Sequence, residues 1–120
     1  MKKVLLVDDK REIRLLVQTT LRGSDYEFYS ATNGKEAVEK ALSIKPDLIL
    51  LDVTMPEMDG FEACRQIRSS PETKSIPVIM LTGRGQEADI EKGKECGADD
   101  YFTKPFSPLE LLKKVDEILE

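Results

Sequence analysis

Residues 48–52 read Leu48-Ile49-Leu50-Leu51-Asp52, an apolar run that ends in a single carboxylate. A short continuous apolar run of this kind is typical of a parallel strand that is buried on both faces. The chain turns directly afterwards at Thr54-Met55-Pro56, so we expect Asp52 to lie at the carboxyl end of the strand. An aspartate that only stabilises the turn is the structural alternative to a functional carboxylate.

Apolar, β-branched-rich runs alternate with segments of helical periodicity along the whole chain. The predicted strands are about 4–7, 27–31, 48–51, 78–82 and 100–103, and the predicted helices are about 10–22, 34–43, 60–68, 86–96 and 108–119. Repeated right-handed crossovers between parallel strands form a doubly wound sheet with helices on both faces. Five strands and five helices fit the flavodoxin-like (βα)5 order 2-1-3-4-5. We therefore predict one α/β domain over residues 1–120.

Three of the predicted helices begin with a cap residue and a glutamate three positions later. These pairs are Asn33–Glu36, Asp59–Glu62 and Ser107–Glu110. The apolar faces of the first two helices include Leu16 and Leu42. The fourth helix has a weak apolar stripe that Gly93 interrupts, so we predict that it is the least stable, with Gly97 as its left-handed stop.

Polar side chains follow four of the predicted strands at the point where each strand ends. They are Asp8-Asp9, Asp52, Thr82 and Lys104. The carboxyl ends of parallel strands share one edge of the sheet, and strands one and three are neighbours at its switch point. Carboxylate oxygens hold Mg²⁺, while a hydroxyl and an ammonium group hold phosphate oxygens. The sequence therefore predicts an acidic, phosphate-handling site at this edge.

Each of these residues also has a purely structural interpretation. Asp9 could cap the first helix, because Asp9-Lys10-Arg11-Glu12 fits the capping-box pattern, although a cap does not explain the adjacent Asp8. Strand propensity alone could account for Thr82, and Lys104 could be a solvated surface lysine. The Lys104-Pro105 bond is a candidate cis peptide. The second acidic pair, Asp99-Asp100, precedes its strand, so we interpret it as turn chemistry only.

Composition narrows the classes of function. Charged residues form 34% of the chain and the formal net charge is -5, which predicts no nucleic-acid partner. No apolar stretch approaches the roughly 20 residues of a membrane span, and no signal peptide is evident, so we expect a cytoplasmic protein. Cys64 and Cys96 lack metal-site spacing and are predicted to be buried thiols outside any disulfide. The absence of histidine removes imidazole ligands and Cys–His nucleophile pairs, so the chemistry must use carboxylates.

Four ordered motifs resemble the receiver domain of bacterial two-component response regulators, and the resemblance covers essentially the whole chain. The motifs are Val-Asp-Asp at 7–9, Leu-Leu-Asp-Val-Thr-Met-Pro-Glu-Met-Asp-Gly at 50–60, Ile-Met-Leu-Thr-Gly at 79–83 and Gly-Ala-Asp-Asp-Tyr-Phe-Thr-Lys-Pro-Phe at 97–106. This resemblance implies that Asp52 is the phosphoacceptor.

The resemblance also implies the other site roles. Asp8 and Asp9 would bind Mg²⁺, or alternatively Mn²⁺, together with Asp52 and the backbone carbonyl of Thr54. Lys104 would contact the phosphoryl group. Thr82 would hydrogen-bond to it, and Tyr101 would change rotamer in response. We further hypothesise that Thr54 and Arg84, which vary in the family and border the water route, set the lifetime of the phosphorylated state.

The implied function is a phosphoacceptor switch with self-phosphorylation and self-dephosphorylation chemistry only, rather than a turnover enzyme. Its partners would be a sensor histidine kinase or phosphotransfer protein and an unknown downstream effector, read by the face of the fourth helix, fifth strand and fifth helix. The chain could be a monomer or a phosphorylation-dependent dimer. Because Met1 begins the first strand and Glu120 ends the last helix, we expect a stand-alone receiver or a fragment of a longer regulator.

Other classes of function remain as alternatives. A receiver-like domain could bind partners without being phosphorylated. A haloacid-dehalogenase-like phosphohydrolase also uses a strand-end aspartate, but position 54 is threonine where that class usually has a second aspartate, and its acidic pair normally comes last. A flavodoxin-like cofactor binder would need a Gly/Ser/Thr-rich phosphate loop after the first strand, which is lacking.

Overall fold

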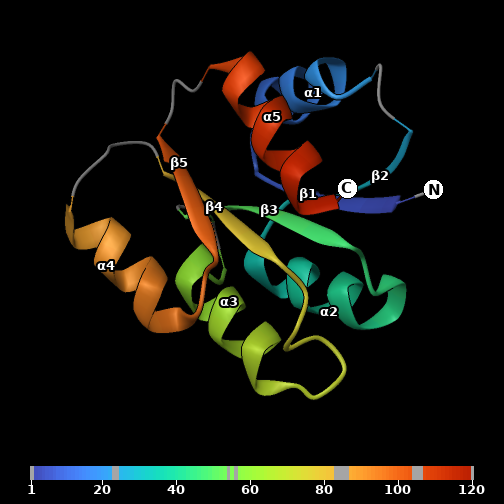
Figure 1. The fold of residues 1–120 in the computed structure, drawn as a ribbon. Coiled ribbons are helices and arrows are strands. Elements are labelled where there is room, and N and C mark those ends of the chain that lie inside the picture. The colour runs from blue at the N-terminus through green and yellow to red at the C-terminus, as the bar shows by residue number, and fades with distance from the viewer. Residues whose placement is uncertain are drawn as a thin grey trace.

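The computed structural model describes residues 2–22, 25–53, 55, 57–82, 87–103 and 107–119. Its five parallel strands are β1 (Lys2–Val7), β2 (Tyr26–Ala31), β3 (Leu48–Asp52), β4 (Val78–Thr82) and β5 (Asp100–Thr103). They form one sheet in the order β2-β1-β3-β4-β5. The predicted order 2-1-3-4-5 is therefore confirmed, and β1 and β3 are neighbours at the switch point (Figure 1).

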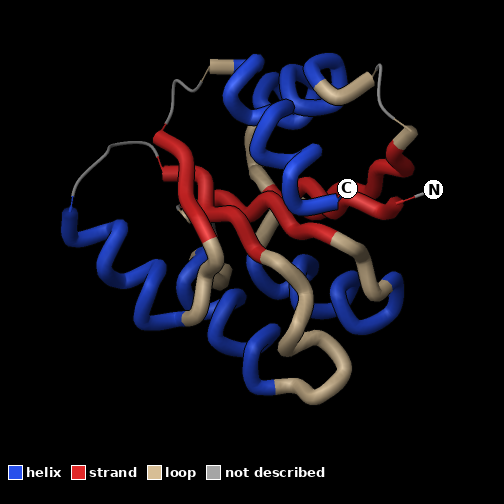
Figure 2. The backbone as a smooth tube through the Cα atoms, viewed as in Figure 1, coloured by secondary structure: helices blue, strands red, loops and turns tan. Residues whose placement is uncertain are grey.

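Five helices cover the two faces of the sheet. They are α1 (Arg11–Thr20), α2 (Gly34–Ile44), α3 (Gly60–Ser69), α4 (Glu87–Cys96) and α5 (Pro108–Leu119). Figures 1 and 2 show α1 and α5 on one face and α2, α3 and α4 on the other. Each helix begins and ends within a few residues of its predicted boundaries.

The core has two halves, one on each side of the sheet, because successive side chains of a strand point to opposite faces. In β3, Ile49 and Leu51 pack toward α2 and α3. Leu48 and Leu50 pack with the buried residues of α1 and α5. All residues of β3 and β4 are buried, as expected for central strands of a doubly wound sheet.

Two residues assigned to apolar helix faces are exposed, so those predictions were wrong. Leu16 is 43% exposed and Leu42 is 38% exposed. The other three residues of the expected α1 face do point inward: Ile13 and Val17, continued by Leu21 just after the helix, lie at intervals of four residues. Leu16 lies one position off that row, so helical periodicity identified the apolar helix but not the exact angle at which it faces the sheet.

The predicted caps of the later helices are present. The Asn33 side chain accepts a hydrogen bond from the Glu36 amide at 2.8 Å, and Asp59 accepts one from the Glu62 amide at 2.9 Å. At α5 the Ser107 hydroxyl is 3.4 Å from the Glu110 amide. The left-handed stop at Gly97 is confirmed by its φ of 97°. The low stability of α4 stays a prediction.

Candidate functional site

Three carboxylates meet at the carboxyl edge of the sheet. One carboxylate oxygen each from Asp8, Asp9 and Asp52 can be chosen so that all three lie within 4.8 Å of one another. Asp8 follows β1 and Asp52 ends the neighbouring β3, which is the arrangement predicted from the strand order. Asp8 and Asp52 are only 2% and 4% exposed, whereas Asp9 is exposed.

Local hydrogen bonds hold Asp8 in this position. Its amide donates to the Ala31 carbonyl at 3.1 Å, which extends the pairing of β1 with β2 by one residue. Its carboxylate accepts from the Lys10 amide at 2.9 Å. Its carbonyl accepts from the Arg14 guanidinium at 2.7 Å. Arg14 was not identified from the sequence, where it is simply a basic residue on α1, since only the fold shows that its side chain reaches back to Asp8.

The proposal that Asp9 caps α1 is wrong. Lys10 occupies the cap position in extended conformation, and no side chain caps the helix there. The carboxylate that bonds to the backbone at this turn belongs to Asp8. The backbone enters the helix one residue later than the capping-box pattern predicts, so Asp9 contributes its carboxylate to the acidic group rather than to the helix end.

Asp52 is positioned by close approach of α3. The Gly60 amide donates to the Val53 carbonyl at 2.8 Å, and the Val53 amide donates to the Leu81 carbonyl of β4 at 3.1 Å. A Cβ atom on Gly60 would lie 2.2 Å from the Asp52 carbonyl oxygen, so only glycine fits. This role of Gly60 was not predicted from the sequence, although a glycine directly after the cap residue Asp59 was its visible signal.

A second glycine supports the same loop from α2. The Gly34 amide donates to the Met58 carbonyl at 3.0 Å, and a Cβ atom on Gly34 would lie 2.2 Å from that oxygen. The loop also contains Glu57 with a φ of 67°, a left-handed conformation that L residues rarely adopt. The backbone after Asp52 is thus held from two helices at once.

Thr82 and Tyr101 lie near each other in the sheet. Thr82 is the buried last residue of β4, and its hydroxyl is 3.5 Å from the Phe102 carbonyl of β5. Tyr101 is half-buried in β5, pairs with Met80 of β4 and packs against the core on the α3 side. The remaining predicted site residues, Thr54, Arg84, Lys104 and Pro105, lie outside the described residues.

The assignment of Asp99 and Asp100 to turn chemistry only is wrong. They do lie at the opposite, amino edge of the sheet, as predicted. However, Asp99 forms an ion pair with Arg68 at 2.6 Å and accepts from the Val78 amide at 2.8 Å. Asp100 pairs with Lys114 of α5 at 3.0 Å, which raises the pKa of that ammonium group. Both partners are distant in sequence, so local pattern could not reveal them.

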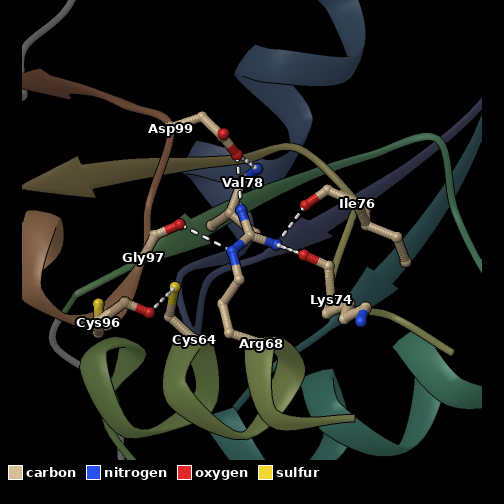
Figure 3. A network of polar contacts seen from close by, with 8 residues as sticks. All are labelled: Cys64, Arg68, Lys74, Ile76, Val78, Cys96, Gly97 and Asp99. Atoms are coloured by element: carbon tan, nitrogen blue, oxygen red, sulfur yellow. Dashed lines mark hydrogen bonds and ion pairs between the residues drawn. The ribbon is translucent and has the colours of Figure 1, made fainter. Parts of the chain in front are cut away.

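The two cysteines are buried thiols outside any disulfide, as predicted. The fold brings them together, since the Cys64 thiol donates to the Cys96 carbonyl at 3.3 Å. Burial, and after it the neighbouring Cys96 thiol, together raise the pKa of Cys64 to about 12. They lie by α3 and the end of α4 (Figure 3) and take no part in the acidic group.

The chemistry of the acidic group fits a hard divalent cation. Its donors are carboxylate oxygens, which suit Mg²⁺ or Mn²⁺ and not the thiolate- and imidazole-seeking metals. Like charges this close repel one another, and a cation among them would remove that repulsion. Asp8, Asp9 and Asp52 are the described residues that could hold it.

Comparisons with characterised proteins agree with this geometry. A sequence model of the response regulator receiver domain matches residues 4–116. Two Bacillus subtilis proteins are similar: the alkaline phosphatase synthesis transcriptional regulatory protein PhoP, 48% identical over 118 residues, and the transcriptional regulatory protein ResD, 49% identical over 117 residues. Each alignment covers 98% of this chain and 48% of the relative. The chain therefore spans about half the length of these curated relatives.

Solved structures of similar fold include a putative response regulator from Chloroflexus aurantiacus, with a TM-score of 0.93, 38% identity, and coverage of 98% of this chain and 97% of that one. Chemotaxis protein CheY4 of Vibrio cholerae has a TM-score of 0.90 and 40% identity, with 98% of both chains covered. A third similar structure is the receiver domain of the sensor histidine kinase PA1611 from Pseudomonas aeruginosa, with a TM-score of 0.90 and 31% identity over 99% of this chain and 98% of that one. That structure was solved with a magnesium ion coordinated in its active site cleft.

None of the helices in the described ranges has the length and apolar character of a membrane span. Three observations indicate the same family. They are the strand order, the acidic group at the switch point and the match of the family model to residues 4–116. The chain belongs to the response regulator receiver domain family of two-component signalling.

Proposed function

We propose that this domain is a phosphoacceptor switch in which Asp52 takes a phosphoryl group from a sensor histidine kinase or phosphotransfer protein. The observation that carries the proposal is the convergence of Asp8, Asp9 and Asp52 within 4.8 Å at the switch point of the sheet. Enzyme-like reactions of this domain are limited to its own phosphorylation and dephosphorylation.

The reaction follows from the carboxylates. A carboxylate oxygen of Asp52 attacks phosphorus in line, the new O–P bond forms as the bond to the donor breaks, and an acyl phosphate results. Asp8, Asp9, Asp52 and the Thr54 carbonyl would hold Mg²⁺, or alternatively Mn²⁺, as the PA1611 receiver holds magnesium in its cleft. The bound cation would neutralise charge on the phosphoryl oxygens. Lys104 would contact the same oxygens, and Thr82 would donate its hydroxyl to one of them.

The output would be a change at the face of α4, β5 and α5. Thr82 is the residue best placed to begin it, because its hydroxyl already reaches toward the Phe102 carbonyl of β5. A new hydrogen bond from Thr82 to the phosphoryl group would compete with this contact. Tyr101, next to Phe102 in β5, would then change rotamer. An effector or a second copy of the domain would read the altered face, as a phosphorylation-dependent dimer in the latter case.

We place this switch in the cytoplasm, as one receiver domain over residues 1–120, without a nucleic-acid partner of its own. Arg84 and Thr54 are proposed to set the lifetime of the acyl phosphate. Slower or faster loss of the phosphoryl group in Thr54→Ala and Arg84→Ala would support that role, and unchanged rates in both would remove it.

The test is intact mass after incubation with acetyl phosphate and Mg²⁺, sampled from short times onward. The expected result is one added phosphoryl group, which is absent in Asp52→Asn and in the presence of a chelator. The matched control is Asp59→Asn, because Asp59 is an exposed aspartate at the start of α3 and asparagine preserves its cap. An equal adduct in Asp52→Asn would assign the phosphoryl group to another residue and refute the role of Asp52. No adduct in the wild type at any time would favour the alternative of a phosphorylation-independent interaction domain.

A further inference from the structure

A cluster of polar contacts at the amino edge of β4 and β5 has no role in the proposed phosphoryl chemistry. Its centre is the guanidinium of Arg68, near the end of α3 (Figure 3). It donates to the carbonyls of Ile76 at 2.6 Å, Gly97 at 2.8 Å and Lys74 at 3.1 Å, and it pairs with Asp99 at 2.6 Å. One side chain therefore joins α3, the loop before β4, the end of α4 and the start of β5.

The partners of Arg68 are themselves fixed. Asp99 exchanges two hydrogen bonds of 2.8 Å with Val78, one from each amide, which attach it to the first residue of β4. Gly97 has a φ of 97°, and a Cβ atom there would lie 2.9 Å from the Cγ atom of Arg68. The Arg68 side chain is only 20% exposed, so water competes weakly for these charge-assisted bonds.

Further contacts attach the second half of α4 to α3. Buried Cys64 of α3 donates its thiol to the carbonyl of buried Cys96, the last residue of α4. The Lys92 ammonium lies 5.7 Å from the centre of the Phe61 ring, within range of a cation–π contact. These contacts add to those of Arg68 at the C-terminal end of α4.

We infer that Arg68 is a positioning residue that anchors the C-terminal end of α4, so that α4 changes position by pivoting about this end. The guanidinium spreads its donors over the loop before β4 and the loop between α4 and β5. Losing it would leave three carbonyls and one carboxylate without their common donor. The anchor is independent of phosphorylation. The pivoting motion rests on the proposed switch function.

The first experiment uses the protein without any phosphoryl donor. It compares Arg68→Met with the matched control Arg65→Met, because Arg65 lies on the same helix and, within the described part of the chain, makes only an exposed ion pair with Glu62. One readout is hydrogen exchange of the Val78 and Asp99 amides. The other is alkylation of Cys64 in a Cys96→Ala background, where the acceptor of the Cys64 thiol is a backbone carbonyl and is retained.

Loss of the anchor should raise both rates by about tenfold or more relative to Arg65→Met, since charge-assisted bonds that resist local opening are removed. Arg68→Lys, which keeps the charge but not the forked geometry, should fall between the two. If Arg68→Met behaves like Arg65→Met, the anchor is refuted. An equal rise at the β1 and β3 amides would also refute it, because that would be loss of global stability. Asp99→Asn provides the same comparison if Arg68→Met does not fold.

The second experiment tests the pivot after treatment with acetyl phosphate and Mg²⁺, with intact mass measured on the same samples. In the phosphorylated protein, exchange in residues 87–91 should change while the Val78 and Asp99 amides and the Cys64 thiol stay protected. Loss of protection at Val78, Asp99 and Cys64 in a sample that carries the adduct would overturn the pivot. Absence of the adduct would overturn the switch function and the pivot with it, and the first experiment still decides the anchor.

Discussion

Aspartates lie at both edges of the sheet, and their surroundings differ. At the amino edge, two aspartates that precede strands, Asp47 and Asp99, bond to the neighbouring strand. Asp47 accepts from the Lys3 amide at 2.7 Å and donates its own amide to the Lys3 carbonyl at 2.8 Å. Asp99 makes the same pair of bonds with Val78. These carboxylates tie adjacent strands together where they begin.

At the carboxyl edge, Asp8, Asp9 and Asp52 face one another instead. Two of the three are almost fully buried, which increases the repulsion between like charges because burial lowers the effective dielectric constant. The comparison teaches that the same residue type stabilises the fold at one edge and opposes it at the other. An arrangement that costs stability at the switch point is what a functional site for cation and phosphate would require.

The largest loss of stability should come from adding a side chain at Gly60, which packs directly against the backbone of Asp52. Gly60→Ala should destabilise the fold by about 3 kcal/mol, since its Cβ atom would overlap the Asp52 carbonyl. At the other edge, Gly97→Ala should cost about 1–2 kcal/mol, because its positive φ is strained but the nearby Arg68 side chain can move. Urea unfolding of both variants measures the difference. A smaller loss in Gly60→Ala than in Gly97→Ala would contradict the rigid packing of α3 on Asp52.

The next largest loss of stability should come from removing an aspartate at the amino edge of the sheet. Asp99→Ala should destabilise the protein by about 2 kcal/mol, because both the ion pair with Arg68 and the bond from Val78 are lost. Asp47→Ala should cost about 1 kcal/mol, since it removes only the bond from Lys3 among those described. Equilibrium unfolding in urea compares the two, and equal losses would show that Arg68 adds nothing to stability.

Removing an aspartate from the carboxyl edge should increase the stability of the folded protein, whereas removing one from the amino edge should decrease it. Asp52→Asn should stabilise the protein in chelator by about 1 kcal/mol, since it relieves repulsion among the three carboxylates without changing side-chain volume. Adding Mg²⁺ should raise the melting temperature of the wild type more than that of the variant, because ligand binding stabilises the folded state by mass action. A lower stability of Asp52→Asn in chelator would refute the view that this group is under strain.

The smallest effect is a change in the pKa of Lys114, which lies on α5 beside Asp100 of β5. Asp100 raises the pKa of Lys114 above its ordinary 10.5, chiefly by accepting its hydrogen bond. The charged lysine therefore favours the folded state below the unfolded pKa, and this contribution is lost as the pH rises through the folded pKa. Asp100→Asn should lower the pKa of Lys114, as measured by NMR titration of its side chain. Glu27→Gln is the control and should leave that pKa unchanged, because the Glu27 carboxylate accepts from the Tyr29 hydroxyl and is not among the groups that raise the pKa of Lys114.

Much of the carboxyl edge was predictable because it depends on short-range rules. Alternating strands and helices imply right-handed crossovers, and five such units fit the flavodoxin-like strand order 2-1-3-4-5. The order then places Asp8 and Asp9 beside Asp52 without any knowledge of side-chain contacts. The role of Gly60 was missed, since its sequence position after a helix cap looked sufficient to explain it. The alternative interpretation of Asp9 as a cap was wrong because the helix begins one residue later than the motif suggests.

The amino edge was much less predictable. Arg68 and Asp99 are 31 residues apart, and neither belongs to a local motif that requires the other. Cys64 and Cys96 were correctly predicted to be buried thiols, but their contact depends on how α3 and α4 pack. Leu16 and Leu42 were wrongly placed on the apolar faces of their helices, since a helical stripe defines such a face only to within about one residue of rotation.

The sequence by itself determined the fold class, the strand order and the residues that meet at the switch point, because apolar periodicity and chain connectivity are read locally. The tertiary structure alone decided the Arg68 cluster, the cysteine contact and the close approach of Gly60 to Asp52. Those features arise between side chains and backbone segments that are far apart in sequence, and their geometry exists only once the helices have packed on the sheet.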